Sequence, residues 1–188
     1  MHDRSVVACL VSVAVLTTGR LALREPVATD AAAVLIFRGD PDVQRYDAEP
    51  LRDYAEAEAF IAFLHSESAA NLRRHWVITL GGAVVELIGL HTWDHHHRRA
   101  ELGFDIAKAH WGHGIAAEAA RAVIQFGFTT MALHRIQAHS IADNTRSIRL
   151  LERLGFRREG TLREYSLEDD GIFHDSALYG LLHTDALA

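Results

Sequence analysis

Two glycines stand two positions apart, between an apolar segment and an alanine-rich one, and their spacing suits the binding of a phosphate group. Gly112 and Gly114 allow the backbone to approach a ligand closely. The helix expected to begin at Gly114 leaves its first amide groups without partners inside the helix. Because such amides form an anion site at a helix N-terminus, the sequence predicts an anion-binding loop over residues 112–117.

The same glycines, together with Ala117, also satisfy the dinucleotide pattern G-x-G-x-x-G/A. In a dinucleotide-binding fold the first glycine follows the strand directly, whereas residues 107–111 intervene here. Asp143, the acid that could contact a ribose, lies well beyond the usual distance of about 20 residues. No Lys-Ser or Lys-Thr pair follows the glycines, as a P-loop requires. These features disfavour NAD and ATP, and the loop by itself does not name its ligand.

The patterns on either side of the loop predict the elements that position it. Residues 76–80 and 83–90 are two apolar strands around a Gly-Gly pair, which is typical of a hairpin with a primed turn. Periodicity predicts further strands over residues 21–24, 100–106, 135–141, 157–166 and 172–182, and helices over residues 31–37, 54–66, 114–130 and 145–154. One strand-helix-strand unit among hairpins is too few for a doubly wound sheet, so we expect a mixed α/β sheet.

Two helix ends and one connection have expected local features. Asp30 is expected to cap the helix over residues 31–37, and Gly155 to follow the helix over residues 145–154. The connection over residues 42–52 carries no periodic pattern and is expected to be irregular.

Composition limits the class of protein. A chain of 188 residues that is 49% hydrophobic and 23% charged suits one domain with a substantial core. A net charge of -6 with 19 basic residues disfavours nucleic acid as the main partner. The single cysteine, Cys9, allows no internal disulfide and suits a reducing compartment, so a cytoplasmic protein is expected.

The first residues carry an apolar run that needs its own interpretation. Residues 6–16 are too few to cross a bilayer, and they lack a good signal-peptide cleavage site. We therefore expect residues 1–16 to be an extension or the lead-in to the first strand, and no membrane partner.

Six short motifs occur in order along the chain, and together they resemble a known family. The motifs are RLALR from Arg20, IGL from Ile88, AELGF from Ala100, WGHGIAAEA from Trp111, NTRS from Asn144 and LGF from Leu154. This combination resembles the GNAT acetyltransferases, and most of all the branch that contains the ribosomal-protein N-terminal acetyltransferases, here called the Rim-type branch. The resemblance implies one domain over residues 17–182, followed by a tail over residues 183–188. It also implies a mixed, twisted central sheet with helices on both faces and a splay between two parallel strands.

The resemblance implies that acetyl-CoA is the co-substrate, with its pyrophosphate on the loop over residues 112–117. The family loop reads Gln/Arg-x-x-Gly-x-Gly/Ala, which Gly114 and Ala116 fit, whereas Trp111 occupies the first place. The phosphate grip is therefore expected to rest on backbone amides, to which a cationic His113 would add. The pantetheine arm is expected to pair with strand main-chain groups. The implied cofactor-binding residues are Phe104, Asp105, Ile106, Gly112, His113, Gly114, Ile115, Ala116, Ala117 and Asn144.

The resemblance further implies direct attack of an amine on the thioester, which needs a base because only a neutral amine is nucleophilic. Glu101 matches the base of histone-type relatives, and Glu164 matches the position proposed for the Rim-type branch, so both remain candidates. Leu151 stands where many GNAT proteins have a proton-donating tyrosine. Ser147 matches the serine with that role in the Rim-type branch, although a first-turn helix serine is equally ordinary.

A protein N-terminal α-amine is the favoured acceptor, because its reference pKa of about 7.7–8.0 lies below the value of about 10.4 for lysine. Small amines such as polyamines or aminoglycosides are competing acceptors. A non-catalytic module that binds acyl-CoA is the alternative from another class. Homodimers occur in the Rim-type branch, so a homodimer is an expectation by analogy alone.

A histidine-rich segment between two expected strands invites comparison with a metal site. His91, Asp94 and residues 95–97 supply ligand types, but consecutive side chains in a connection do not converge easily on one ion. No metal is therefore expected. Trp93 and Trp111, which flank the region, could line a pocket, but aromatic residues next to glycine loops more often pack as core.

Overall fold

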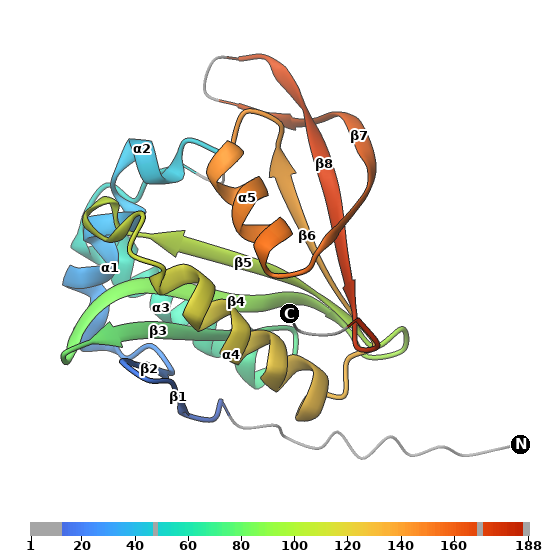
Figure 1. Cartoon of the computed structure of the whole chain (residues 1–188). Coiled ribbons are helices and arrows are strands. Elements are labelled where there is room, and N and C mark those ends of the chain that lie inside the picture. The colour runs from blue at the N-terminus through green and yellow to red at the C-terminus, as the bar shows by residue number, and fades with distance from the viewer. Residues whose placement is uncertain (1–12, 47–48, 169–170, 186–188) are drawn as a thin grey trace, which may run out of the picture.

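The computed structural model describes residues 13–46, 49–168 and 171–185, which form one eight-stranded twisted sheet with helices on both faces (Figure 1). The order of the strands across the sheet is β1-β2-β3-β4-β5-β6-β8-β7. Neighbouring strands are antiparallel, except that β5 and β6 are parallel. The strands are β1 (Leu16–Thr17), β2 (Leu21–Arg24), β3 (Arg74–Leu80), β4 (Ala83–Asp94), β5 (Arg99–Ile106), β6 (Arg135–Ile141), β7 (Arg157–Leu167) and β8 (Phe173–Leu182). The mixed α/β sheet predicted from the sequence is confirmed.

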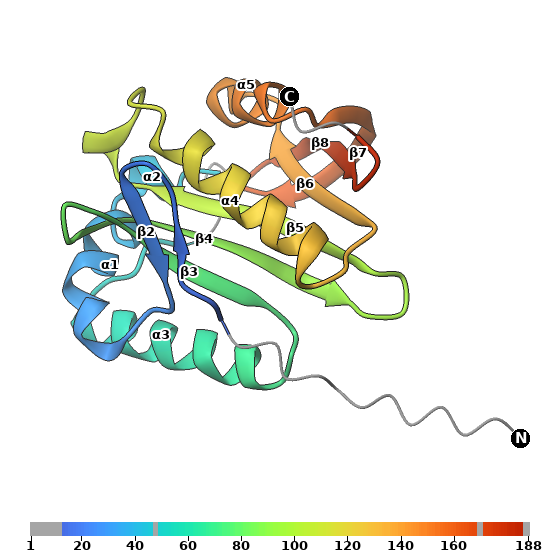
Figure 2. The same ribbon diagram turned by 60° about the horizontal axis from the view of Figure 1, so that its bottom comes forward.

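Helices cover the two faces of the sheet in separate layers (Figure 2). α1 (Ala31–Arg38) and α3 (Tyr54–Ala69) pack over Val77 of β3 and Leu87 of β4. α4 (Ile115–Thr129) lies on the opposite face, and α5 (Thr145–Arg153) lies beside it. The connections contain the short elements η1 (Ala28–Asp30), α2 (Pro41–Gln44) and η2 (Lys108–His110).

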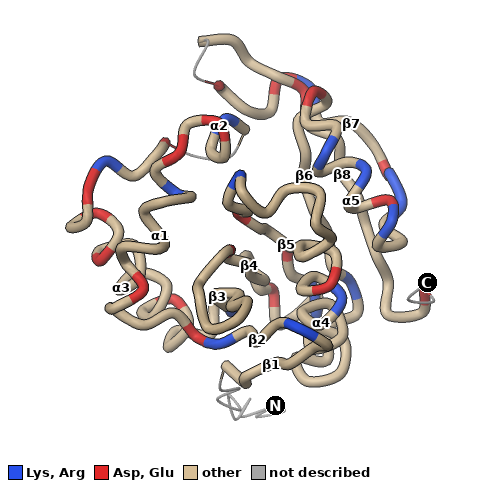
Figure 3. Tube along the Cα trace, turned by 60° about the vertical axis from the view of Figure 1, so that its left-hand side comes forward, with Lys and Arg blue, Asp and Glu red and all other residues tan. Residues whose placement is uncertain are grey.

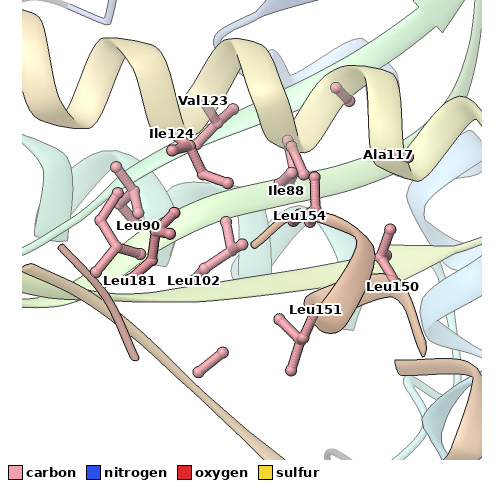
Figure 4. Packing of buried hydrophobic residues seen from close by; sticks show 14 of the residues in the cluster. Ile88, Leu90, Leu102, Ala117, Val123, Ile124, Leu150, Leu151, Leu154 and Leu181 are labelled. Carbon is pink, nitrogen blue, oxygen red and sulfur yellow. The ribbon is translucent and has the colours of Figure 1, made fainter. Parts of the chain in front are cut away.

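The larger core lies between α4, α5 and the sheet. Figure 4 shows Val123 and Ile124 of α4 pointing toward Ile88 and Leu90 of β4. Trp76 of β3 is fully buried in the same core. These contacts fix α4 over the middle of the sheet. The loop that begins α4 is therefore held beside the C-terminal end of β5.

β5 and β6 are paired over a short distance and then diverge. The paired residues are Arg99 with Arg135, Ala100 with Ile136 and Glu101 with Gln137. Beyond Glu101, β6 continues along β8 as far as Ile141, while β5 continues along β4 (Figure 1). In the described part of the chain, the edge of β5 after Glu101 therefore has no strand partner on the β6 side. This gap is the splay that the resemblance implied.

The prediction that Asp30 caps α1 is wrong. Asp30 occupies the N-cap position of α1, but its side chain makes no capping hydrogen bond there. Its carboxylate instead accepts from the backbone N–H of Val27 at 2.8 Å and pairs with the guanidinium of Arg24 at 2.7 and 2.8 Å. The cation of β2, which lies six residues away, competes successfully for the carboxylate because a charge-assisted bidentate pair is stronger than a cap.

The prediction that residues 42–52 are irregular is wrong in its first part, because α2 runs from Pro41 to Gln44. Proline suits the first position of a helix, where its missing N–H costs no hydrogen bond. Asp40 caps this turn, since its side chain accepts from the backbone N–H of Asp42 at 2.9 Å.

The ends of the chain are described in part. Residues 1–12 of the expected N-terminal extension lie outside the described residues, as do residues 186–188 of the expected tail and residues 169–170 in the turn between β7 and β8. Within the described residues, no helix is both long enough and apolar enough to cross a membrane.

Gly89 of β4 provides space for a histidine ring on the neighbouring strand. A Cβ atom at Gly89 would lie 2.3 Å from Cδ2 of His75 and 2.8 Å from the carbonyl oxygen of Arg74. Because β3 would have to move, we expect Gly89→Ala to lower the free energy of unfolding by about 1–3 kcal/mol, measured by urea denaturation. Gly160→Ala in β7, where a Cβ would meet nothing within 4 Å, is the matched control. Equal losses at the two positions would contradict this explanation.

Candidate active site

A groove of about 940 Å³ runs along the splay, between β5, the start of α4 and one side of α5. It brings together Ser147 and every predicted cofactor-binding residue except His113. The predicted residues that line it are Phe104, Asp105, Ile106, Gly112, Gly114, Ile115, Ala116, Ala117, Asn144 and Ser147. His113 is exposed and its side chain is not part of the lining. Residues from three separated segments therefore meet in one concave site.

The loop before α4 has a backbone shape that favours glycine. Gly112 and Gly114 have φ angles of +81° and +75°, which residues with a Cβ adopt at a cost. Gly114 is the N-cap residue of α4, and no side chain among the described residues caps this helix. The first amide groups of α4 are consequently available to an anion in the groove.

Three arginines of α5 add positive charge to the groove. Arg146, Arg149 and Arg153 line it, and their spacing of three and four residues places them on one side of the helix. Their signal in the sequence was this helical spacing over residues 145–154, but it was not recognised. An anion in the groove would therefore meet guanidinium groups as well as the expected backbone amides.

Trp111 lines the groove, which is the less favoured of the two alternatives given for it, pocket lining and core packing. Its indole Nε1 donates to the carbonyl oxygen of Ile106 at 2.9 Å. The guanidinium carbon of Arg146 lies 3.8 Å from the centre of the indole ring, within the range of a cation–π contact. Trp111 thus connects the end of β5 with the arginine-bearing side of α5.

Asn144 and Ser147 are linked at the start of α5. Asn144 is the N-cap residue, and its Oδ1 accepts from the backbone N–H of Ser147 at 3.2 Å. The amide NH₂ of Asn144 and the hydroxyl of Ser147 are the donors that remain for a ligand. Leu151, one turn further on, is 1% exposed and belongs to the core, so it contributes no polar group.

The side chain of Asp105 is committed to the fold. It is buried and accepts from Nη1 of Arg38 at 2.9 Å and from Nε2 of Gln44 at 2.9 Å. Arg38 ends α1 and Gln44 ends α2, so the two helices are tied to β5 through one carboxylate. Any contact between Asp105 and a cofactor would consequently involve its main chain.

Glu101 lies at the point where β5 and β6 part, and it does not lie alone. Its Oε2 is 3.6 Å from Nε2 of His139 on β6, and its side chain is 21% exposed. The ring of Tyr165 on β7 stacks on His139, with 5.3 Å between ring centres and 9° between the planes. Sequence reasoning missed His139 and Tyr165. They lie 38 and 64 residues from Glu101, and no local motif surrounds either residue.

Glu164, the other candidate base, is in a different environment. Its side chain is exposed, and its φ angle is +50° where the pairing of β7 with β8 is interrupted. Its backbone N–H donates to Oδ1 of Asp175 at 2.9 Å. Because Tyr165 reaches His139 from the same interruption, this part of β7 lies beside the splay, with Glu164 at its outer surface.

The α2 side of the groove carries a second charge pair. Asp42 forms an ion pair with Nζ of Lys108 from η2, and Lys108 also lies 4.0 Å from Asp40. The hydrogen bond and charge of Lys108 lower the pKa of the Asp42 carboxyl. The two carboxylates that line this wall, Asp42 and Asp105, are therefore both paired with cations.

The histidine-rich connection between β4 and β5 has structural contacts of its own. The ring of His95 stacks on Trp93 at 4.1 Å, and Oδ1 of Asp94 accepts from the backbone N–H of His97 at 2.8 Å. Over the ranges that the structure describes, no three His, Cys, Asp or Glu residues are grouped so as to hold a metal ion.

Comparison with known proteins identifies the class of this fold and groove. A family model described as an acetyltransferase (GNAT) domain matches residues 20–157. The chain therefore belongs to the GNAT acetyltransferase family, whose members are N-acetyltransferases that use acetyl-CoA.

Individual relatives agree with the family. The chain is 35% identical over 171 residues to the uncharacterized N-acetyltransferase p20 of Bacillus licheniformis, covering 89% of this chain and 95% of that protein. It is 39% identical over 84 residues to the [ribosomal protein uS5]-alanine N-acetyltransferase of Escherichia coli, covering 45% and 43% of the two chains.

Two solved structures share the fold. Mycobacterium smegmatis RimJ in complex with CoA-disulfide has a TM-score of 0.78 at 27% identity, covering 86% of this chain and 81% of that one. Spermidine N-acetyltransferase from Vibrio cholerae in complex with CoA and spermine has a TM-score of 0.80 at 25% identity, with coverage of 89% and 98%. These relatives and structures bear names with different amine acceptors, so the comparisons define the reaction and leave the acceptor open.

Proposed function

We propose that this protein, as a member of the Rim-type branch, transfers the acetyl group of acetyl-CoA to the α-amine at a protein N-terminus. The observation that carries the proposal is the convergence of Glu101, His139 and Tyr165 at the point where β5 and β6 part. This arrangement places a candidate base next to the gap between β5 and β6.

The groove suits acetyl-CoA in its shape and its donor groups. Amides at the start of α4 and the guanidinium groups of Arg146, Arg149 and Arg153 supply positive charge for phosphates. The edge of β5 after Glu101 supplies main-chain groups for the peptide-like pantetheine arm. Phe104 and Ile106 would hold that arm through their backbone.

In the proposed mechanism, Glu101 accepts a proton from the amine, directly or through a water molecule. His139 is a positioning residue that holds the Glu101 carboxylate, and the Tyr165 ring holds His139. Bound acetyl-CoA supplies the thioester, whose carbonyl carbon bonds to the amine nitrogen as the bond to sulfur breaks, and the second proton that the nitrogen loses ends on the sulfur to give CoA thiol. Ser147 donates a hydrogen bond to the departing thiolate from its place in the groove.

The paired carboxylates of the α2 wall support an α-amine as the acceptor over a polyamine. A polyamine carries several positive charges and requires several carboxylates without other partners. On the α2 wall, Asp42 is already paired with Lys108 and Asp105 with Arg38. A single α-amine needs one base, and its pKa is low enough for a carboxylate to serve.

A thiol-release assay with a panel of amines tests the proposed function. The panel contains short peptides with free N-termini, the same peptides with blocked N-termini and a single lysine, spermidine, and an aminoglycoside. We expect release of CoA thiol with free N-terminal peptides and little with their blocked counterparts. Faster turnover of spermidine would reject the acceptor, and CoA binding without turnover of any amine would indicate a binding module.

A further inference from the structure

The turn between β1 and β2 lies directly behind the loop that precedes α4. Nη2 of Arg20 donates to the carbonyl oxygen of His113 at 2.8 Å, and Nε of the same guanidinium donates to Oε2 of Glu118 at 2.7 Å. Arg20 thus contacts both the glycine loop and the first turn of α4. It reaches them from outside the groove, since it is not among the lining residues.

The Arg20 contact fixes the orientation of one peptide group. In a trans peptide the C=O of one residue and the N–H of the next point in opposite directions. Because the carbonyl of His113 points to Arg20, the N–H of Gly114 points away from Arg20, and Gly114 lines the groove. The positive φ of Gly114 is one that glycine enters and leaves freely, so the peptide between His113 and Gly114 could rotate without this hydrogen bond.

We propose that Arg20 is a positioning residue that keeps the Gly114 amide turned toward the pyrophosphate of acetyl-CoA. This inference rests on the proposed location of acetyl-CoA in the groove. The role is one of orientation rather than stability, since Arg20 is 46% exposed and exposed ion pairs contribute little to folding.

Two further groups hold Arg20 in place. Glu118 binds its guanidinium, and the hydroxyl of Thr18 donates to the other oxygen of the Glu118 carboxylate. The same Thr18 oxygen accepts from the backbone N–H of Leu21 at 3.0 Å, which closes the turn. The side chain of Glu118 is therefore shared between α4 and the β1–β2 turn, and Arg20 is held between Glu118 and the loop.

The experiment compares Arg20→Ala with Arg24→Ala. Arg24 is the matched control, because it lies on the same hairpin and forms a bidentate ion pair with Asp30 away from the groove. For each variant, the Kd of CoA is measured by calorimetry, and kcat and KM are measured with acetyl-CoA and with S-acetylpantetheine, which lacks the pyrophosphate.

We expect Arg20→Ala to raise the Kd of CoA and the KM of acetyl-CoA about tenfold, as for the loss of one hydrogen bond to a charged group. Its kcat at saturation should stay within about twofold of the native value, and its use of S-acetylpantetheine should match the native protein. Arg24→Ala should bind CoA as the native protein does. Arg20→Lys, which keeps the charge but not the forked geometry, should recover part of the loss.

Two results would overturn the assignment of Arg20. One is an unchanged Kd of CoA in Arg20→Ala. The other is an equal loss with acetyl-CoA and S-acetylpantetheine, which would indicate a general structural role. The calorimetric measurement needs no amine acceptor, so a wrong acceptor leaves it informative. Failure of the native protein to bind CoA would overturn the proposed function together with this inference.

Discussion

Replacing Glu86 by glutamine is expected to stabilise the protein above pH 6, most strongly near pH 8, by removing the loss of stability that this one carboxyl group causes as pH rises. Glu86 lies in β4 and is 0% exposed. Neither oxygen of its carboxyl group has a hydrogen-bond partner within the described residues. Burial raises the pKa of this carboxyl to about 8. The group is therefore a neutral acid at pH 7, held at a cost inside the core.

The surroundings of Glu86 explain why its ionised form is disfavoured. Its register partners are Ile78 on β3 and Ile106 on β5, whose side chains share its face of the sheet. Ile78 belongs to the core beneath α4. These two cross-strand neighbours are aliphatic and offer no compensation for a charge on the carboxyl group.

The direction of the pH effect follows from proton binding in the two states. In the unfolded chain the Glu86 carboxyl has its ordinary pKa of 4.5, whereas in the folded protein the pKa is about 8. Between these values the unfolded state releases a proton that the folded state retains, so the contribution of Glu86 to stability falls as pH rises. The full contribution is present below pH 4.5 and is lost through pH 8, and it amounts to roughly 5 kcal/mol.

Urea unfolding at pH 5 and at pH 8 measures this effect. Glu86→Gln should gain several kcal/mol over the native protein at pH 8 and much less at pH 5. Glu86→Met, which removes the polar group altogether, should behave in the same direction. Glu58→Gln on the exposed side of α3 is the control and should not alter the pH dependence. Parallel pH profiles for Glu86→Gln and the native protein would show that Glu86 ionises normally.

The largest effect on activity is expected from Glu101→Gln. At pH 7 we expect kcat/KM for an N-terminal peptide to fall by about 10² to 10⁴, the range for loss of a general base. The defect should shrink above pH 9, because an α-amine with a pKa of about 7.7–8.0 is then already neutral. Initial rates of thiol release from pH 6 to pH 10 measure both features.

Glu164→Gln is the matched comparison for Glu101→Gln, because both replace a candidate carboxylate by an amide of equal size. Glu164 is exposed and has its backbone N–H bonded to Asp175, so we expect a change of less than about tenfold. A large, pH-dependent loss in Glu164→Gln with near-native activity in Glu101→Gln would transfer the role of base to Glu164. The CoA Kd of both variants should remain native, which separates loss of chemistry from loss of binding.

Local patterns predicted most of the fold. The hairpin around Gly81 and Gly82 has positive φ at both glycines, as the primed turn requires, and α4 begins after Gly114 as the glycine loop indicated. These elements are determined by neighbours in sequence, namely by turn chemistry and by apolar periodicity. The same reasoning failed at Asp30, because its partner Arg24 belongs to a different element.

The parts of the site that sequence reasoning missed depend on distant contacts. His139 meets Glu101 only because β6 pairs with β5 in one register, and Arg20 meets His113 across 93 residues of chain. The apolar periodicity of a sequence carries no information about such long-range contacts. Glu86 was missed for a related reason, since it lies inside an apolar strand where a single acid is ordinarily assigned to the solvent side.

The three-pair seam between β5 and β6 makes this sheet two half-sheets, one of five strands and one of three. A pantetheine arm lying in the gap would act as a removable strand, bonded to the main chain on the β5 side. Binding of acetyl-CoA would then also fill the gap between the two half-sheets. Bound acetyl-CoA would therefore connect the two half-sheets, and this connection would be lost each time CoA leaves.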